Sequence, residues 1–164
     1  MKKKVLVIIA VVFVVVIVVG FLIYRSFCGV FGNPVVASLP KYEKSDCYYG
    51  EGFQDYTDYC KYYFSEESNI IKSLKGNRYF KAVTADDVGE IKSYFKDFED
   101  WVKFEDYKDK YDFCEEYIDT SDYFYIENKY TYKKYADYPD KYSAYNVYFF
   151  DVQTKTLFFI HNNI

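Results

Sequence analysis

The sequence predicts an α+β fold with one N-terminal transmembrane helix, followed by two or three helices packed on a small antiparallel sheet. Three observations lead to this prediction. Residues 5–24 contain no charged side chain, apolar residues recur at helical spacing in the middle of the chain, and a period of two dominates the C-terminal third. Helices followed by a C-terminal strand meander or hairpin are typical of helices packed on one face of an antiparallel sheet.

The apolar run at residues 5–24 is the predicted membrane anchor. At 1.5 Å per residue, a helix of this length spans about 30 Å, the thickness of a hydrocarbon core. Lys2, Lys3 and Lys4 precede the run and Arg25 follows it, so the positive-inside rule places residues 1–4 in the cytoplasm as a basic tail and the rest of the chain outside. A cleaved signal peptide is the alternative, but the run is long for one and no small-residue cleavage site follows closely.

Residues 25–46 are predicted to form a tether, which leaves residues 47–164 as one extracytoplasmic α+β domain. Glycines and prolines interrupt regular structure throughout this stretch, at Gly29, Gly32, Pro34 and Pro40. About 120 residues are enough for one ordinary domain with a core of its own.

The first predicted helical region of the domain covers residues 53–74. Its apolar residues recur three and four positions apart: Phe53, Tyr56, Cys60, Tyr63, Phe64, Ile70, Ile71 and Leu74. An alternative is that Ser65–Ser68 divides the region into two helices, and Gly76-Asn77 is a stop signal of the left-handed type.

A short strand at residues 78–83 and then the clearest helix are predicted next. Thr84 is a suitable N-cap, and Asp87 stands at the third helical position of a capping box. An apolar stripe follows on one face, made of Val88, Ile91, Tyr94, Phe95, Phe98, Trp101 and Val102. Residues 106–119 give an ambiguous pattern.

Three strands are predicted at residues 123–127, 145–151 and 156–161, where tyrosine, phenylalanine, valine and isoleucine are abundant. The short connection Gln153-Thr154-Lys155 predicts an antiparallel hairpin between the last two. Both faces of these strands carry aromatic residues. Either both faces are covered, which we favour, or one face displays an aromatic interaction surface. The candidate residues for that surface are Tyr145, Tyr148, Phe150 and Phe158.

The four cysteines are candidates for disulfides. They are Cys28, Cys47, Cys60 and Cys114, which allow three connectivities. One pairing joins Cys60 to Cys114 and Cys28 to Cys47; alternatively, some thiols are reduced and buried, or Cys28 links two chains. A zinc site is not indicated, because the chain has no Cys-x-x-Cys and only one histidine.

Other candidate chemistry is weak. His161 could serve a nucleophilic enzyme with Cys114 or a serine, but a histidine on the surface at a strand end is the simpler interpretation. Acidic residues gather at Asp106, Asp109, Asp112, Glu115 and Glu116, without the spacing of a calcium loop. No phosphate-binding loop or nucleophile elbow is present, so we predict no cofactor, metal or catalytic residue.

Charge argues against nucleic acid as a partner. The net charge is −4, and because the first 24 residues carry three lysines and no acid, the rest of the chain carries −7. Phosphates would repel such a domain. Lysine greatly outnumbers arginine, a usage that favours a bacterial source.

These observations lead to an expectation of a single-pass membrane protein of the cell envelope. Its tethered domain is expected to be a non-enzymatic binding domain for a protein or a wall glycan. The alternatives are an envelope hydrolase that uses acidic residues near Asp106–Glu116, and a small accessory subunit of a membrane complex in which the helix is the working part.

Overall fold

The computed structural model describes residues 33–51, 56–66, 69–128 and 144–163. The predicted anchor at residues 5–24 lies outside these ranges. Among the described residues, no helix is long and apolar enough to cross a membrane. The chain forms two compact units, Met1–Ser38 and Leu39–Ile164. In the first, the described element is α2 (Pro34–Ala37), which the Asn33 side chain caps.

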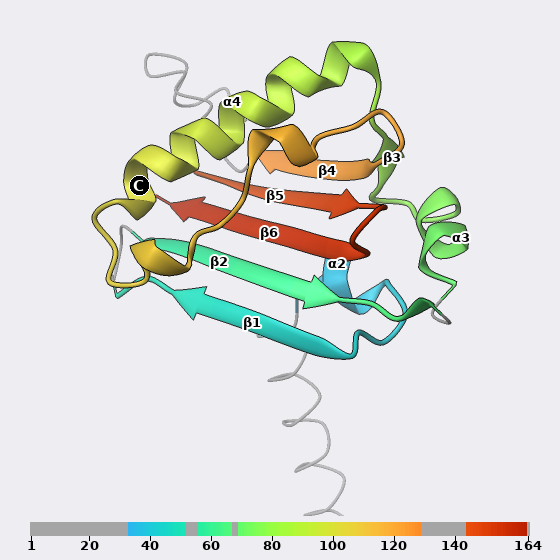
Figure 1. Cartoon of the computed structure of the whole chain (residues 1–164), viewed down its shortest axis with the longest axis horizontal. Coiled ribbons are helices and arrows are strands. Elements are labelled where there is room, and N and C mark those ends of the chain that lie inside the picture. The colour runs from blue at the N-terminus through green and yellow to red at the C-terminus, as the bar shows by residue number, and fades with distance from the viewer. Residues whose placement is uncertain (1–32, 52–55, 67–68, 129–143, 164) are drawn as a thin grey trace, which may run out of the picture. The chain divides into compact units, whose positions relative to one another are not determined.

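The larger unit is built on a six-stranded antiparallel sheet with the order β1-β2-β6-β5-β4-β3 (Figure 1). The strands are β1 (Lys44–Tyr49), β2 (Tyr56–Tyr63), β3 (Lys81–Ala82), β4 (Tyr123–Asn128), β5 (Ala144–Asp151) and β6 (Thr156–Asn163). The predicted α+β class and the C-terminal meander β4-β5-β6 are confirmed. β1 begins inside the predicted tether, at Lys44, and the compact unit begins before it at Leu39.

Helix α4 (Ala85–Val102) is the predicted amphipathic helix and lies across one face of the sheet (Figure 1). It begins as expected, because Thr84 and Asp87 form the capping box. Its apolar stripe forms the main core with the strand residues beneath it. The most buried members from both sides include Ile91, Phe95, Phe98, Tyr145, Phe149 and Ile160.

The ambiguous segment after α4 completes the cover of this face. It contains two short 3-10 helices, η2 (Lys108–Lys110) and η3 (Glu115–Tyr117). The Phe113 ring stacks on Phe95 with 3.6 Å between centroids, and the Tyr111 ring meets Tyr59 edge-on at 5.1 Å. Aromatic packing therefore holds a segment that has little regular structure of its own.

The predicted helical region at residues 53–74 is wrong over most of its length. Residues Tyr56–Tyr63 form strand β2, and only Ile70–Lys75 forms a helix, α3. Spacings of four fit a strand as well as a helix, since Tyr56, Cys60 and Phe64 also share one face at a period of two. The aromatic and β-branched residues of β2 favour the strand. The predicted stop at Gly76 is confirmed, because α3 ends at Lys75, but its left-handed type is wrong, because the φ of Gly76 is −99°.

Candidate functional site

The four residues of the predicted aromatic surface do not share a surface. Tyr145 and Phe158 belong to the core cluster that contains the apolar stripe of α4, whereas Tyr148 and Phe150 alternate onto the opposite face of the sheet. All four are buried, with exposed fractions of 0%, 5%, 2% and 0%. These four side chains are therefore covered, which is the alternative that we favour, and they do not form an exposed aromatic surface.

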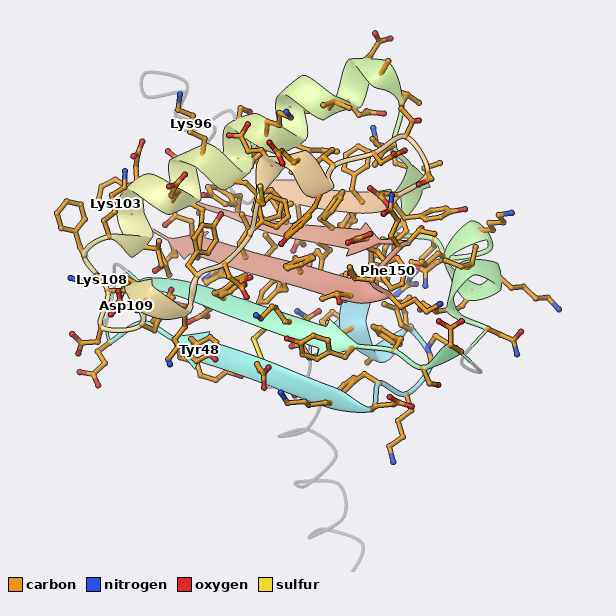
Figure 2. The ribbon with its side chains drawn as sticks, viewed as in Figure 1. Tyr48, Lys96, Lys103, Lys108, Asp109 and Phe150 are labelled. Atoms are coloured by element: carbon orange, nitrogen blue, oxygen red, sulfur yellow. A yellow bond between two sulfur atoms is a disulfide. The ribbon has the colours of Figure 1, made fainter. Side chains whose placement is uncertain are left out.

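Two strongly exposed aromatic side chains lie near the ends of β1 and α4. Tyr49 is 66% exposed and Phe104 is 84% exposed. Both line a hollow of about 420 Å³ whose other walls are Tyr107 and the acids Glu51, Glu105 and Asp106. We call this the Tyr49–Phe104 hollow. In Figure 2 the labels of Lys103, Lys108 and Asp109 mark this end of the molecule.

Hydrogen bonds to β2 fix one wall of the hollow. The Thr57 hydroxyl donates to Glu105 Oε1 at 2.9 Å, and the Tyr107 hydroxyl donates to the Thr57 carbonyl oxygen at 2.9 Å. Burial raises the pKa of Tyr107, so its hydroxyl stays neutral. The segment after α4 is thereby attached to the beginning of β2.

Gly50 makes this attachment possible. A Cβ at this position would lie 2.7 Å from the Thr57 carbonyl oxygen and 2.9 Å from Glu105 Oε1. The Glu105 side chain could shift away from a Cβ, but the Thr57 backbone could not, so the close approach of the two backbones at this strand end requires glycine.

The lining of the hollow is suited to binding a cation. Aromatic faces and carboxylates favour a cationic group, through ring quadrupoles and through charge. Among the described residues, no group of three or more histidines, cysteines or acids could hold a metal ion.

The acids proposed for a hydrolase are distributed over separate contacts. Asp112 accepts hydrogen bonds from the Tyr59 hydroxyl at 2.7 Å and from Lys61 Nζ at 2.6 Å. Burial acts to raise the pKa of Asp112, but these hydrogen bonds lower it overall, which suits a fixed anion better than a general acid. Glu115 lies 3.8 Å from Lys92, and Asp106 lines the Tyr49–Phe104 hollow.

One disulfide forms, but not with the expected partners. Cys47 and Cys60 are joined across β1 and β2, with their Cα atoms 4.1 Å apart. The pairing of Cys60 with Cys114 is therefore wrong, and so is that of Cys47 with Cys28. Cys114 is a free thiol of intermediate exposure, and Cys28 lies outside the described residues. The sequence predicts a tether where β1 forms, so Cys47 was not expected opposite Cys60.

His161 is buried rather than on the surface, with an exposed fraction of 5%. Its Nδ1 lies 2.6 Å from Asn146 Oδ1 on the neighbouring strand. By strand alternation it points to the face opposite α4, whereas Phe113, next to Cys114, packs on the α4 face. The sheet therefore separates His161 from Cys114, and the two cannot form a catalytic pair.

Comparison with family models, curated proteins and solved structures found no significant match. The candidate site consequently rests on its own geometry. The sequence does contain a weak signal for it: Phe104 follows the apolar stripe of its helix and is itself followed by two acids, while Tyr49 is followed by Gly50 and Glu51.

Proposed function

We propose that this chain is a non-enzymatic interaction domain, held at the outer face of the cell membrane by residues 5–24. The observation that carries the binding role is the Tyr49–Phe104 hollow. Two aromatic residues, exposed by 66% and 84%, line this hollow together with three acidic residues. Exposed aromatic groups gathered in one place are typical of a contact surface.

The disulfide supports the extracytoplasmic location. Disulfides persist in oxidising compartments and are rare in the cytosol. The Cys47–Cys60 bond joins two residues that are paired in the sheet, so the fold brings the sulfur atoms together. The uncharged run at residues 5–24 and the three lysines before it support an anchor with a cytoplasmic N-terminus.

Labelling of intact cells with a membrane-impermeant maleimide tests the location. In a Cys28→Ser chain, we expect Cys114 to react directly and Cys47 and Cys60 to react only after reduction and denaturation. A Cys114→Ser chain is the matched control for the direct reaction. Labelling of all three cysteines only after lysis would place the domain in the cytoplasm and overturn this proposal.

Photo-crosslinking tests the hollow itself. A benzophenone amino acid at position 104 keeps an aromatic ring in place, and we expect it to capture a defined partner in intact cells. The same residue at position 117 is the control, because Tyr117 is also exposed, by 42%, but stacks on Phe158 away from the hollow. Equal adducts from both positions, or none from position 104, would argue against a binding role for the hollow.

A further inference from the structure

Strand β1 presents an open edge. In the described part of the chain it has a neighbour on one side only, β2. The Gly50 N–H donates to the Thr57 carbonyl oxygen at 2.8 Å, so Gly50 and every second residue before it bond to β2. The alternating residues Ser45, Cys47 and Tyr49 therefore direct their backbone N–H and C=O groups away from the sheet. Ser45 and Tyr49 are also exposed.

This edge is regular and fixed in register. Residues Lys44–Tyr49 pair one to one with Tyr63–Asp58 of β2. The disulfide joins Cys47 to its partner in this ladder, so a slip of one residue is prevented. A straight edge with unpaired backbone groups is a template for another strand.

We propose that the strand bound by this edge is β1 of a second copy of the chain, paired antiparallel with Cys47 on the two-fold axis. The inference rests on the proposed function, because it names the partner of the Tyr49–Phe104 hollow. In this register Ser45 lies opposite the partner's Tyr49, and all of β1 is paired. Such an isologous contact satisfies the outward backbone groups of both copies at once.

Charge complementarity supports this register. Lys44 lies on the same face of β1 as Gly50, and in the pairing it lies opposite the partner's Gly50. Glu105 Oε1 occupies that position in each copy, 2.9 Å from where a Gly50 Cβ would be. The Lys44 side chain is 67% exposed, pairs with Asp46 and lies over the Tyr63 ring. Because it is exposed, it can turn to the partner's Glu105. The acidic hollow of each copy thereby receives one lysine of the other.

Another antiparallel register would place Ser45 on the axis, with Lys44 opposite the partner's Asp46. That arrangement leaves Tyr49 and the hollow outside the contact. The two registers predict different cysteine cross-links, because residues directly opposite in a hydrogen-bonded pair have Cα atoms about 5.5 Å apart, within reach of a disulfide.

The test is oxidative cross-linking of the full-length chain in its membrane, with Cys28 and Cys114 changed to serine. Two differently tagged chains are co-expressed, one with Ser45→Cys and one with Tyr49→Cys. We expect a disulfide-linked dimer from the mixture and little from either variant alone. A dimer from Ser45→Cys alone would overturn the register, and monomer in every case would overturn the self-association.

A charge exchange provides a second readout. Lys44→Glu in both chains should lower the cross-linked fraction several-fold, and adding Glu105→Lys should restore it. Restored cross-linking would show that Lys44→Glu acts through the charge pair and not through unfolding, because a second charge change would not refold an unfolded chain. Cross-linking that is unchanged by Lys44→Glu would refute the lysine contact. If the dimer fails but the benzophenone at position 104 still captures another protein, the binding role stands with a different partner.

Discussion

Reduction of the Cys47–Cys60 disulfide is expected to lower the free energy of unfolding by about 3 kcal/mol. The two cysteines are 13 residues apart in sequence, and the loop-closure entropy of a chain segment of this length is about 3 kcal/mol at 25 °C. The two cysteines are directly paired between β1 and β2. Breaking the bond therefore raises the conformational entropy of the unfolded chain and changes the folded chain little. Against a typical domain stability of about 5–15 kcal/mol, this is a large fraction.

Urea unfolding, followed by the fluorescence of Trp101, measures this difference. Trp101 is the one tryptophan of the chain. With a slope of about 2 kcal/mol per molar urea, reduction should lower the midpoint by about 1.5 M. A chain with Cys28 and Cys114 changed to serine confines the effect of the reductant to the disulfide. Equal midpoints for the oxidised and reduced chains would refute the loop-entropy argument.

Substitutions at four further positions test the packing around α4 and the segment that follows it. Thr84→Ala should cost about 1 kcal/mol of unfolding free energy, because it removes one side of the capping box. Hydrogen bonds from Lys81 and Thr84 hold the pKa of Asp87 at about 2, below its ordinary value of 3.8. The ionised Asp87 therefore stabilises the folded chain fully at a pH above the pKa that this carboxyl has in the unfolded chain. This stabilisation is lost as the pH falls through about 2. Asp87→Asn should flatten the pH dependence of the urea midpoint in that window. Phe95→Ala should lower the unfolding free energy by about 3–5 kcal/mol, since the Phe95 ring is fully buried between α4 and the sheet. Phe95→Leu should lower it clearly less. Tyr107→Phe should cost about 1 kcal/mol through the lost hydrogen bond to β2, as measured by the same urea titration.

Local signals explain which elements the sequence predicted well. Helix α4 has a capping box at its start and a single apolar stripe along its length, and both depend on residues three or four positions apart. The β5–β6 hairpin has two strongly β-prone runs separated by a short turn, in which Lys155 adopts a φ of 52°. In such elements neighbouring residues carry the information, so the rest of the fold need not be known.

The first two strands illustrate the opposite case. β1 contains two charged residues, Lys44 and Asp46, and its sequence predicts a polar tether. An edge strand needs only one covered face, so it lacks a continuous apolar pattern. β2 reads as a helix, because its apolar spacings fit both periods. Their pairing with each other and with β6 decides the structure. That pairing joins residues far apart in sequence, and the disulfide follows from it.

The candidate site is even harder to predict from the sequence, because the exposure of a side chain depends on the whole fold. Tyr145 and Tyr49 are the same residue type in strands, yet one is fully buried and the other is 66% exposed. Tyr145 lies in the central strand β5 under α4, whereas Tyr49 lies at the end of an edge strand. Tyrosine tolerates both environments, since its ring can pack and its hydroxyl can stay in water. A surface built from aromatic residues is therefore found from strand order rather than from composition. The same strand order that exposes Tyr49 also leaves the backbone edge of β1 open beside it, among the described residues, and this coincidence is the reason that we propose the end of β1 as the binding surface.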